Sequence, residues 1–411
     1  MENVLLVGAS EIEITPAAGL AMDGYMARDS VSAGVHDPLM AQVLVLDQAG
    51  RRAVIVTLDV LGVSQDFSDG LRRDLAALAG TADDAVLICA SHTHAGPSGL
   101  QTWFPVDAAP HLKPDLASLI RQRVLEATRQ AVARLQPAHL RAGSGELAGL
   151  GGDRNRPDQP VDQQVSVLSF HDANDAPIAV LFHFACHPTV LSAANYLYSA
   201  DFPGAARQHI RAVYPGAIAL YLNGAAGNIS TRFYRRDQSF AEVARLGQML
   251  GERVLDLMRA SSIEAAAVDW QCEAIALPFR VFAAEARALA GTGNARLDTV
   301  RAEGAFIEAQ LRRALGGRVA QTTVVCAVRV GSWVLLATPG EAFSDLALAL
   351  RAVDPHALIV GYANDYVGYF PTQAAIDAAT YEALSSPYDA RAHELLYERL
   401  SAMMRRVPSN E

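Results

Sequence analysis

AVLICASHTHAGP, at residues 85–97, is the stretch that decides how the rest of the chain is interpreted. Its first six residues are apolar and β-prone, which predicts a buried strand over Ala85–Ala90 that leaves its sheet just before two histidines. In an extended chain alternate side chains share a face, so His92 and His94 are expected to point the same way. Two imidazoles on one face, followed by a Gly-Pro turn, suit a metal site. Taken alone, the motif fits a polar surface turn equally well.

The same arrangement recurs along the chain, where apolar runs end in unusual polar clusters. Strands are predicted over Ala41–Asp47, Ala53–Val60, Ala85–Ala90, Val165–Phe170, Ile178–Cys186, Ala217–Leu222, Thr323–Val330, Trp333–Ala337 and Ala357–Tyr362. Besides Ser91–His94, the clusters are Asp59, His187–Thr189, Asn223–Ser230, Thr338–Glu341 and Ala363–Tyr369. In α/β folds ligand sites form outside the carboxyl ends of strands, because the loops converge there. We therefore expect these clusters to meet at one site.

The order of the predicted elements favours an α/β fold with mixed β-sheets flanked by α-helices. Apolar stripes at helical spacing predict helices around Phe67–Leu78, Leu116–Ala127 and Val243–Leu257. The runs Thr323–Val330 and Trp333–Ala337 are separated only by a turn containing glycine, which predicts a hairpin and hence a mixed sheet. We expect a single domain over residues 1–411. Within it, residues 282–315 are expected to form an insertion of two helices, joined by a turn at residues 291–294.

Composition excludes several functional classes. Of 411 residues, 51% are hydrophobic and 19% charged, and the net charge is −10, which argues against nucleic acid or an anionic membrane as a partner. No apolar run approaches the roughly 20 residues of a transmembrane helix. The four cysteines form no CxxC pair, which predicts buried, reduced thiols. The N-terminus resembles a strand more than a signal peptide, so we expect a cytoplasmic protein.

The residue types in the clusters favour a metal-dependent hydrolase. His92, His187 and Glu341 could supply three N/O ligands and leave a position open, which is what catalytic zinc needs to activate water. Each has an alternative: His187 could be a core histidine bonded to a carbonyl, and Glu341 could stabilise a helix N-terminus. The Gly151–Pro157 loop carries two arginines that could bind a carboxylate or an oxyanion, or lie in solvent. The chain has no P-loop and no Gly-x-Ser-x-Gly motif.

Several motifs, in matching order along nearly the whole chain, resemble the catalytic domain of the neutral, non-lysosomal ceramidases. They are Met22–Met26, Gly34–His36, Ser91–Pro97, Asn155-Arg156, Phe184–Pro188, Asn223–Ser230, Pro339–Glu341, Asn364–Tyr369 and Tyr381-Glu382. Each is improbable by chance, and their shared order makes the resemblance specific. The resemblance implies a ceramidase-like fold.

The resemblance also implies roles for individual residues. It implies a zinc ion held by His92, His187, Glu341 and Tyr369. It implies that His94 handles protons beside the metal, that Arg156 and Tyr381 steady the oxyanion, and that Ser230 contacts the polar group of the substrate. The implied reaction is attack of zinc-activated water on an amide carbonyl, which releases a carboxylate and an amine.

The chain departs from the family pattern in loops that face the substrate. Gly227-Asn228 replaces the family's Gly-Asp, Ser230-Thr231 replaces Ser-Pro, and Pro157 follows Arg156. The family's C-terminal immunoglobulin-like domain and secretion signal are not expected here. We therefore expect a small-molecule amide or N-acyl substrate, smaller than or different from ceramide.

Three alternatives stay open. One is a zinc-dependent hydrolase of esters, lactones or cyclic amides. Another is a TIM-barrel amidohydrolase or a metallo-β-lactamase relative, although Gly96-Pro97 and the predicted hairpins disfavour both. The last is a metal- or ligand-binding protein that has lost catalysis, against which His94 and Tyr381 speak. The sequence also leaves a homo-oligomer open.

Overall fold

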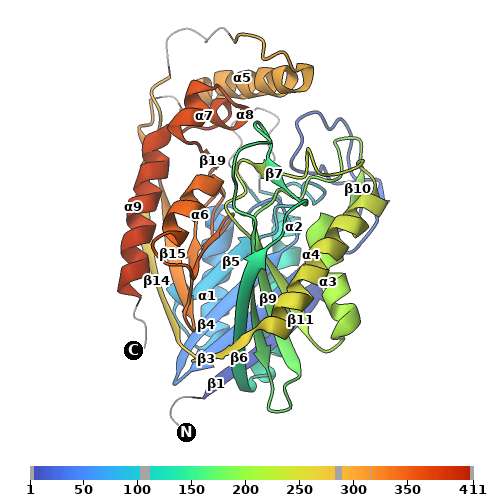
Figure 1. Cartoon of the computed structure of the whole chain (residues 1–411), viewed down its shortest axis with the longest axis vertical. Helices are drawn as coiled ribbons and strands as arrows, with labels where there is room; N and C mark the ends of the chain where they lie inside the picture. The colour runs from blue at the N-terminus through green and yellow to red at the C-terminus, as the bar shows by residue number, and fades with distance from the viewer. Residues whose placement is uncertain (1–3, 102–111, 283–288, 316, 408–411) are drawn as a thin grey trace.

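Two mixed β-sheets form the core of the computed structural model, which describes residues 4–101, 112–282, 289–315 and 317–407 (Figure 1). In the described part, the larger sheet has nine strands in the order β11-β9-β8-β6-β1-β3-β4-β5, with β13 beside β6. Its strands are β1 (Leu5–Glu13), β3 (Met40–Gln48), β4 (Arg51–Leu58), β5 (Val86–Ala90), β6 (Gln136–Glu146), β8 (Gln164–His171), β9 (Pro177–Phe184), β11 (Ile218–Asn223) and β13 (Ser262–Glu264).

The smaller sheet packs against one face of the larger one. Its order is β14-β15-β16-β18, and its strands are β14 (Val268–Pro278), β15 (Ala320–Val330), β16 (Trp333–Ala337) and β18 (Ala357–Val360). One apolar cluster contains side chains of both sheets, including Leu44 and Leu181 of the larger and Leu335 and Val360 of the smaller. The two sheets therefore share an apolar interface.

Helices cover the outer faces of both sheets. The larger sheet packs against α1 (Gln65–Ala79), α2 (Pro114–Ala133), α3 (Asp201–Val213) and α4 (Phe240–Ala260). The smaller sheet packs against α6 (Ser344–Arg351) and α9 (Ala390–Arg406), and Figure 1 shows these two on the flank opposite α3 and α4. Among the described helices, none has both the length and the apolar character needed to cross a bilayer.

Local sequence explains why these elements form. Residues 53–58 of β4 are all buried, because the sheet is covered on both faces, and they are accordingly an almost continuous apolar run. Helix α4 starts with an N-cap in which Ser239 Oγ accepts a hydrogen bond from the Glu242 amide. Helix α1 ends at Gly80, whose φ of 69° is the left-handed conformation that closes many helices.

Three pairs of parallel strands end at the same level and so position the loops that follow. The last paired residues are Leu58 with Ala90, Phe184 with Asn223, and Ala337 with Val360. Beyond these ends lie short pairings of β2 (Gly34–Val35) with β10 (Leu197–Tyr198), β7 (Gly152–Asp153) with β12 (Ile229–Ser230), and β17 (Glu341–Ala342) with β19 (Tyr369–Phe370). The expected convergence of polar loops at strand ends is confirmed.

The predicted fold class is confirmed, with two differences in its elements. Strands β6 and β14 and helices α3, α6 and α9 are additional to those predicted. In the predicted helical insertion, the structure has one helix, α5 (Ala295–Leu315), preceded by a non-helical segment over 289–294. The other predicted helix falls largely on residues 283–288, outside the described residues. Short helices α7 (Gln373–Asp377) and α8 (Tyr381–Leu384) lie near α5, and a 3-10 turn, η1, spans Asp83–Ala85.

The prediction of four reduced thiols is wrong for one pair. Cys272 on β14 and Cys326 on β15 are directly opposite each other in the antiparallel register and form a disulfide. The two residues are far apart in sequence, so their spacing carried no sign of pairing. Cys89 and Cys186 are free and buried, as predicted. The cytoplasmic location and the boundaries of a single domain stay predictions.

Candidate metal centre

His92 enters the centre from the loop that follows β5. Its φ is 67°, so the backbone leaves the extended conformation here; His92 and His94 do face the same centre, as predicted, but through this turn and not through strand alternation. The His92 ring stacks on Tyr362 with centroids 3.9 Å apart, and its Nδ1 lies 2.7 Å from the carbonyl oxygen of Leu61. Because a carbonyl only accepts, Nδ1 carries the proton and Nε2 presents a lone pair to the centre.

His187 is oriented in the same way by the loop after β11. Its backbone lies beside Ser230 in a parallel bridge, and its Nδ1 donates to the carbonyl oxygens of Ala226 at 2.7 Å and Ile229 at 3.0 Å. The lone pair of Nε2 therefore also faces the centre. Carbonyl acceptors behind metal-binding histidines are common, since they fix the tautomer and the ring.

Glu341 supplies a carboxylate between the two imidazoles. Its Oε1 accepts a hydrogen bond of 2.5 Å from the Tyr366 hydroxyl, while Oε2 lies 2.9 Å from His187 Nε2 and 3.6 Å from His92 Nε2. Neither His187 Nε2 nor Glu341 Oε2 has a hydrogen-bond partner among the described residues, although both atoms are buried. Converging, buried lone pairs without a donor are unfavourable unless a cation lies between them. The residues present thus fit a metal ion.

The protonation states of these groups suit a cation as well. Burial lowers the pKa of both His92 and His187 to about 3, so both rings are neutral at neutral pH and able to act as ligands. Burial raises the pKa of the Glu341 carboxyl, against the charges of its neighbours. A buried carboxylate gains a counter-charge when a divalent ion binds beside it.

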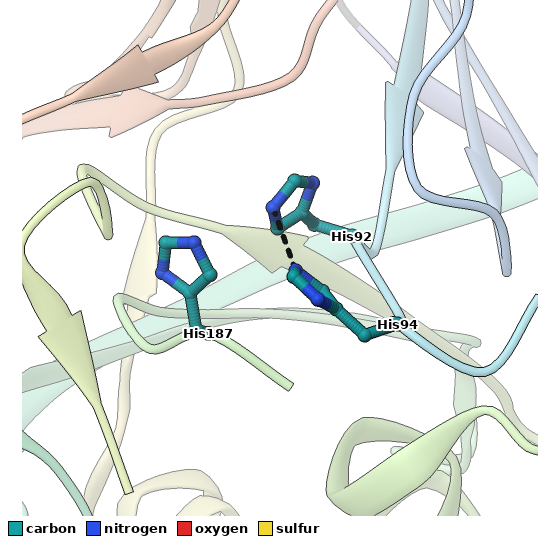
Figure 2. A group of neighbouring side chains, drawn as sticks. All are labelled: His92, His94 and His187. Atoms are coloured by element: carbon teal, nitrogen blue, oxygen red, sulfur yellow. Dashed lines mark hydrogen bonds between the residues drawn. The ribbon is translucent and has the colours of Figure 1, made fainter. Parts of the chain in front are cut away.

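His94 completes a group of three histidines, which Figure 2 shows from one side. Its Nε2 lies 3.3 Å from His92 Nε2, and the ligand atoms of His92, His94 and His187 all lie within 4.8 Å of one another. Its Nδ1 is buried without a hydrogen-bond partner in the described part of the chain. Burial is the main reason why the pKa of His94 lies well below its usual value, and the charges of the other two histidines lower it further. His94 is thus close enough to exchange protons at the centre.

Tyr369 is brought to the centre by strand pairing. It lies directly opposite Glu341 in the parallel pair β17–β19, so the two side chains are neighbours on one face. The Tyr369 hydroxyl accepts a 3.0 Å hydrogen bond from Arg154 Nη2. Arg154 is in turn held by the Glu382 carboxylate, through its Nε, and by the carbonyl oxygen of Gly227 at 2.9 Å.

The structure brings Arg154, and not Arg156, to the centre. The Asp153 carboxylate accepts hydrogen bonds from the amides of Asn155 and Arg156, 2.8 Å each, and this turn leaves Arg156 exposed. Arg156 lines a separate cavity of about 150 Å³. The placement of Arg156 at the site is therefore wrong, because two arginines two residues apart gave the sequence no means of choosing.

The centre lies at the wall of a cavity of about 590 Å³. Ser230, Tyr381, His92, His94, Glu341 and Tyr369 all line it. Ser230 Oγ accepts a hydrogen bond from the Arg232 amide at 3.3 Å, and the Tyr381 ring lies edge-on to Tyr369 with centroids 6.1 Å apart. Two predicted site residues do not line this cavity. His187 lies behind the lining, in contact with Glu341, and Arg156 lies elsewhere.

A second group of metal-ligating side chains lies at the other end of the larger sheet. It consists of His139, His171 and Asp175. Both ring nitrogens of His171 have hydrogen-bond partners, the carbonyl oxygen of Asp175 and Ser169 Oγ, and Arg141 Nη1 lies 3.5 Å from the Asp175 carboxylate. These contacts leave fewer open lone pairs than at the first centre, and the Arg141 guanidinium already supplies a positive charge beside the Asp175 carboxylate.

The fold and the site together define a two-sheet α/β protein with a buried centre of histidine, carboxylate and phenol side chains. The profile of the family described as neutral/alkaline non-lysosomal ceramidase, N-terminal, matches residues 5–217. The chain belongs to this family, which confirms the resemblance inferred from its motifs.

Relatives named as neutral ceramidases align over about half of the chain. That of Pseudomonas aeruginosa is 32% identical over 243 residues, covering 54% of this chain and 36% of the relative. Neutral ceramidase 1 of Arabidopsis thaliana is 29% identical over 228 residues, covering 51% and 29%. That of Mycobacterium tuberculosis is 28% identical over 235 residues, covering 52% and 37%. The aligned part thus spans between 29% and 37% of these relatives' lengths.

The fold extends the similarity to the whole chain. The crystal structure of neutral ceramidase from Pseudomonas aeruginosa superposes with a TM-score of 0.81 at 24% identity, covering all of this chain and 76% of that one. A structure titled ceramidase complexed with C2 gives a TM-score of 0.80 at 22% identity. The fold is therefore that of these ceramidases.

Proposed function

We propose that this protein is a zinc-dependent hydrolase that cleaves a linear amide bond of an N-acyl compound. The observation that carries the proposal is the convergence of three buried lone pairs, from His92, His187 and Glu341, with two of the atoms lacking any donor among the described residues. The Tyr369 phenol beside Glu341 completes the proposed ligand set. Imidazole and carboxylate ligands in a site open to a cavity suit catalytic zinc.

Zinc at this centre would supply Lewis acidity toward a carbonyl oxygen and make water nucleophilic at neutral pH. His94, neutral and 3.3 Å from His92, is placed to accept a proton from the attacking water and deliver it to the leaving amine. Arg154 and Tyr381 line the same cavity and offer donors to a developing oxyanion. Glu382 fixes the guanidinium of Arg154 in place.

Metal content tests the centre without any substrate. The purified protein should contain about one zinc per chain, and His92→Ala or His187→Ala should lose it. His139→Ala is the matched control, since it removes a histidine from the second group and should keep the zinc. Full zinc retention in both His92→Ala and His187→Ala would overturn the proposed ligand set.

Hydrolysis tests the reaction. Zinc-loaded protein should cleave at least one member of a panel of ceramides, short N-acyl amino acids, simple amides and lactones. His94→Ala should keep its zinc and lose about 10²- to 10⁴-fold in turnover, which is the usual contribution of general acid–base catalysis. A protein that binds zinc and cleaves none of these compounds, or an undiminished His94→Ala, would contradict the proposal.

A further inference from the structure

The cavity wall around the metal centre carries an unusual number of arginines. Besides Arg154, the cavity is lined by Arg28, Arg232, Arg235 and Arg296. Arg232 and Arg235 follow β12 in the turn after Ser230, and Arg296 lies in the first turn of α5, which covers the end of the molecule where α7 and α8 lie (Figure 1). We name Arg232, Arg235 and Arg296 the arginine cluster.

No carboxylate neutralises the arginine cluster in the described part of the chain. The guanidinium hydrogen bonds of Arg232 and Arg235 go to neutral oxygens, the carbonyls of Arg154 at 2.8 Å and Thr189 at 2.5 Å, and the Thr231 hydroxyl at 3.3 Å. Within 4.0 Å of the three guanidiniums there is no carboxylate oxygen among the described residues. An arginine has five N–H donors, so most donors of the cluster stay open.

The carboxylates that line the same cavity are already committed or stand apart. Glu382 is bound by Arg154 and Asn155, and Glu341 belongs to the metal centre. Asp23 hydrogen-bonds to Ser98 and Gln101, and burial raises its pKa to about 6. Glu303 is the remaining acidic residue of the lining, and it forms no ion pair with the arginine cluster. Glu382 attracts Arg232 and Asp201 attracts Arg235 only from beyond ion-pair distance, so the cluster is a positive region without a directly paired carboxylate among the described residues.

Burial makes this region costly without an anion. Arg232 and Arg235 are only partly exposed, and burial lowers the pKa of Arg232 to about 10, with further lowering by Arg154, Arg296 and Arg235 and partial opposition from Glu382. Arg232 still carries its full charge at neutral pH. Like charges held together in a partly desolvated cavity repel each other, and an oxyanion relieves that repulsion through bidentate hydrogen bonds.

From this placement we infer that the arginine cluster binds a carboxylate on the substrate, so that the enzyme cleaves N-acyl amino acids in preference to neutral amides. The inference rests on the proposed function and narrows its substrate class. The cavity places the cluster and the metal centre in one continuous space, so an amide carbonyl at the centre can belong to a molecule whose carboxylate reaches the cluster. A neutral amide with hydroxyl groups offers the cluster no charge.

Matched ligands test the charge directly, without turnover. Zinc-loaded His94→Ala is titrated by calorimetry with an N-acylglycine and with the corresponding N-acylglycinamide, which differ only in the carboxylate. The carboxylate should bind about 10- to 100-fold more tightly, since hydrogen bonds to charged groups are among the stronger ones. Equal dissociation constants would overturn the inference.

Arginine variants then locate the effect. Arg296→Gln and Arg235→Gln, each in the His94→Ala background, should weaken binding of the carboxylate about tenfold and leave the carboxamide unchanged. Arg236→Gln is the control, because it removes the same charge from an exposed residue that does not line the cavity. Arg296 is exposed and makes no side-chain ion pair in the described chain, so its replacement leaves folding intact. Equal losses for both ligands, or an equal loss in Arg236→Gln, would overturn the inference.

An N-acyl phosphoethanolamine and its uncharged N-acylethanolamine form a second ligand pair. Tighter binding of the phosphate than of the N-acylglycine would overturn the assignment to a carboxylate. The proposed function and this inference fail in different experiments. If zinc-loaded wild-type protein cleaves no compound of the panel, the proposed function fails. The calorimetric comparison needs no cleavage and tests the carboxylate site alone.

Discussion

Gly24 should be required for activity, because it leaves the space that the His94 ring occupies. A Cβ at this position would lie 2.4 Å from both Cγ and Nδ1 of His94, where an ordinary contact needs at least 3.4 Å. In Gly24→Ala the ring therefore has to move by about 1 Å, and misplacement of a catalytic group by that amount lowers kcat/KM by roughly 100-fold. The three atoms nearest to the new methyl group all belong to His94, which is not among the proposed metal ligands, so bound zinc should be retained.

Gly19 provides a control for the backbone. The φ angles of Gly24 and Gly19 are +101° and +102°, so alanine is strained at both positions, by about 1–3 kcal/mol. A Cβ at Gly19, however, meets no heavy atom within 4 Å. The two variants thus share the conformational penalty and differ in the contact with His94.

The assay compares kcat/KM, bound zinc and the urea midpoint for wild type and both variants, with the best substrate of the hydrolysis panel. Gly24→Ala should lose at least as much stability as Gly19→Ala, both should keep their zinc, and only Gly24→Ala should lose activity. If Gly24→Ala were as active as Gly19→Ala, the position of His94 would not matter for the reaction. If both were equally inactive, backbone strain and not the His94 contact would be responsible.

Three further perturbations test other parts of the structure. Arg154→Gln should lower kcat/KM by about 10²- to 10³-fold, as expected for loss of an oxyanion donor, while Arg156→Gln should be neutral; the reverse order would contradict the placement of Arg154. Cys326→Ser opens a disulfide across a sequence separation of 54 and should lower the free energy of unfolding by about 4 kcal/mol in urea titrations; an unchanged midpoint would refute a stabilising role. Arg207→Met leaves Asp59 buried without its partner and should cost about 3–5 kcal/mol, much of it recovered by adding Asp59→Asn; a single variant as stable as wild type would argue against the ion pair.

Much of the fold could be predicted because most strands are covered on both faces. A strand such as β4 must then be apolar along its length, and the apolar run marks its position within two residues. Strand β14 is harder to recognise, because it is partly exposed over most of its length and mixes polar with apolar residues. Helix α9 was not predicted, although it carries an apolar stripe at helical spacing that includes Leu396, Leu400 and Met403. That spacing is sufficient to predict the helix.

The candidate site could be predicted only in part. His92 and His187 follow long buried strands, so their sequence context indicates where they lie. Tyr369 lies on a strand of two residues, too short for any pattern, and only the family resemblance pointed to it. The partner of Asp59 was also beyond prediction, because the carboxylate pairs with Arg207, which lies far along the chain.

The ligand set spans both sheets, and this gives the metal centre a role in the architecture as a whole. The family profile ends at residue 217 and so contains His92 and His187, whereas Glu341 and Tyr369 belong to the part matched by fold alone. Backbone hydrogen bonds join the two parts around the centre, from the amide of Ala90 to the Tyr362 carbonyl and from the amide of Asn364 to the Ile88 carbonyl. A cation between the proposed ligands would tie the two sheets together at the edge where their loops meet. The same cation would offset the electrostatic cost of burying Glu341 at that edge, so we expect occupancy of the centre and packing of the sheets to stabilise each other.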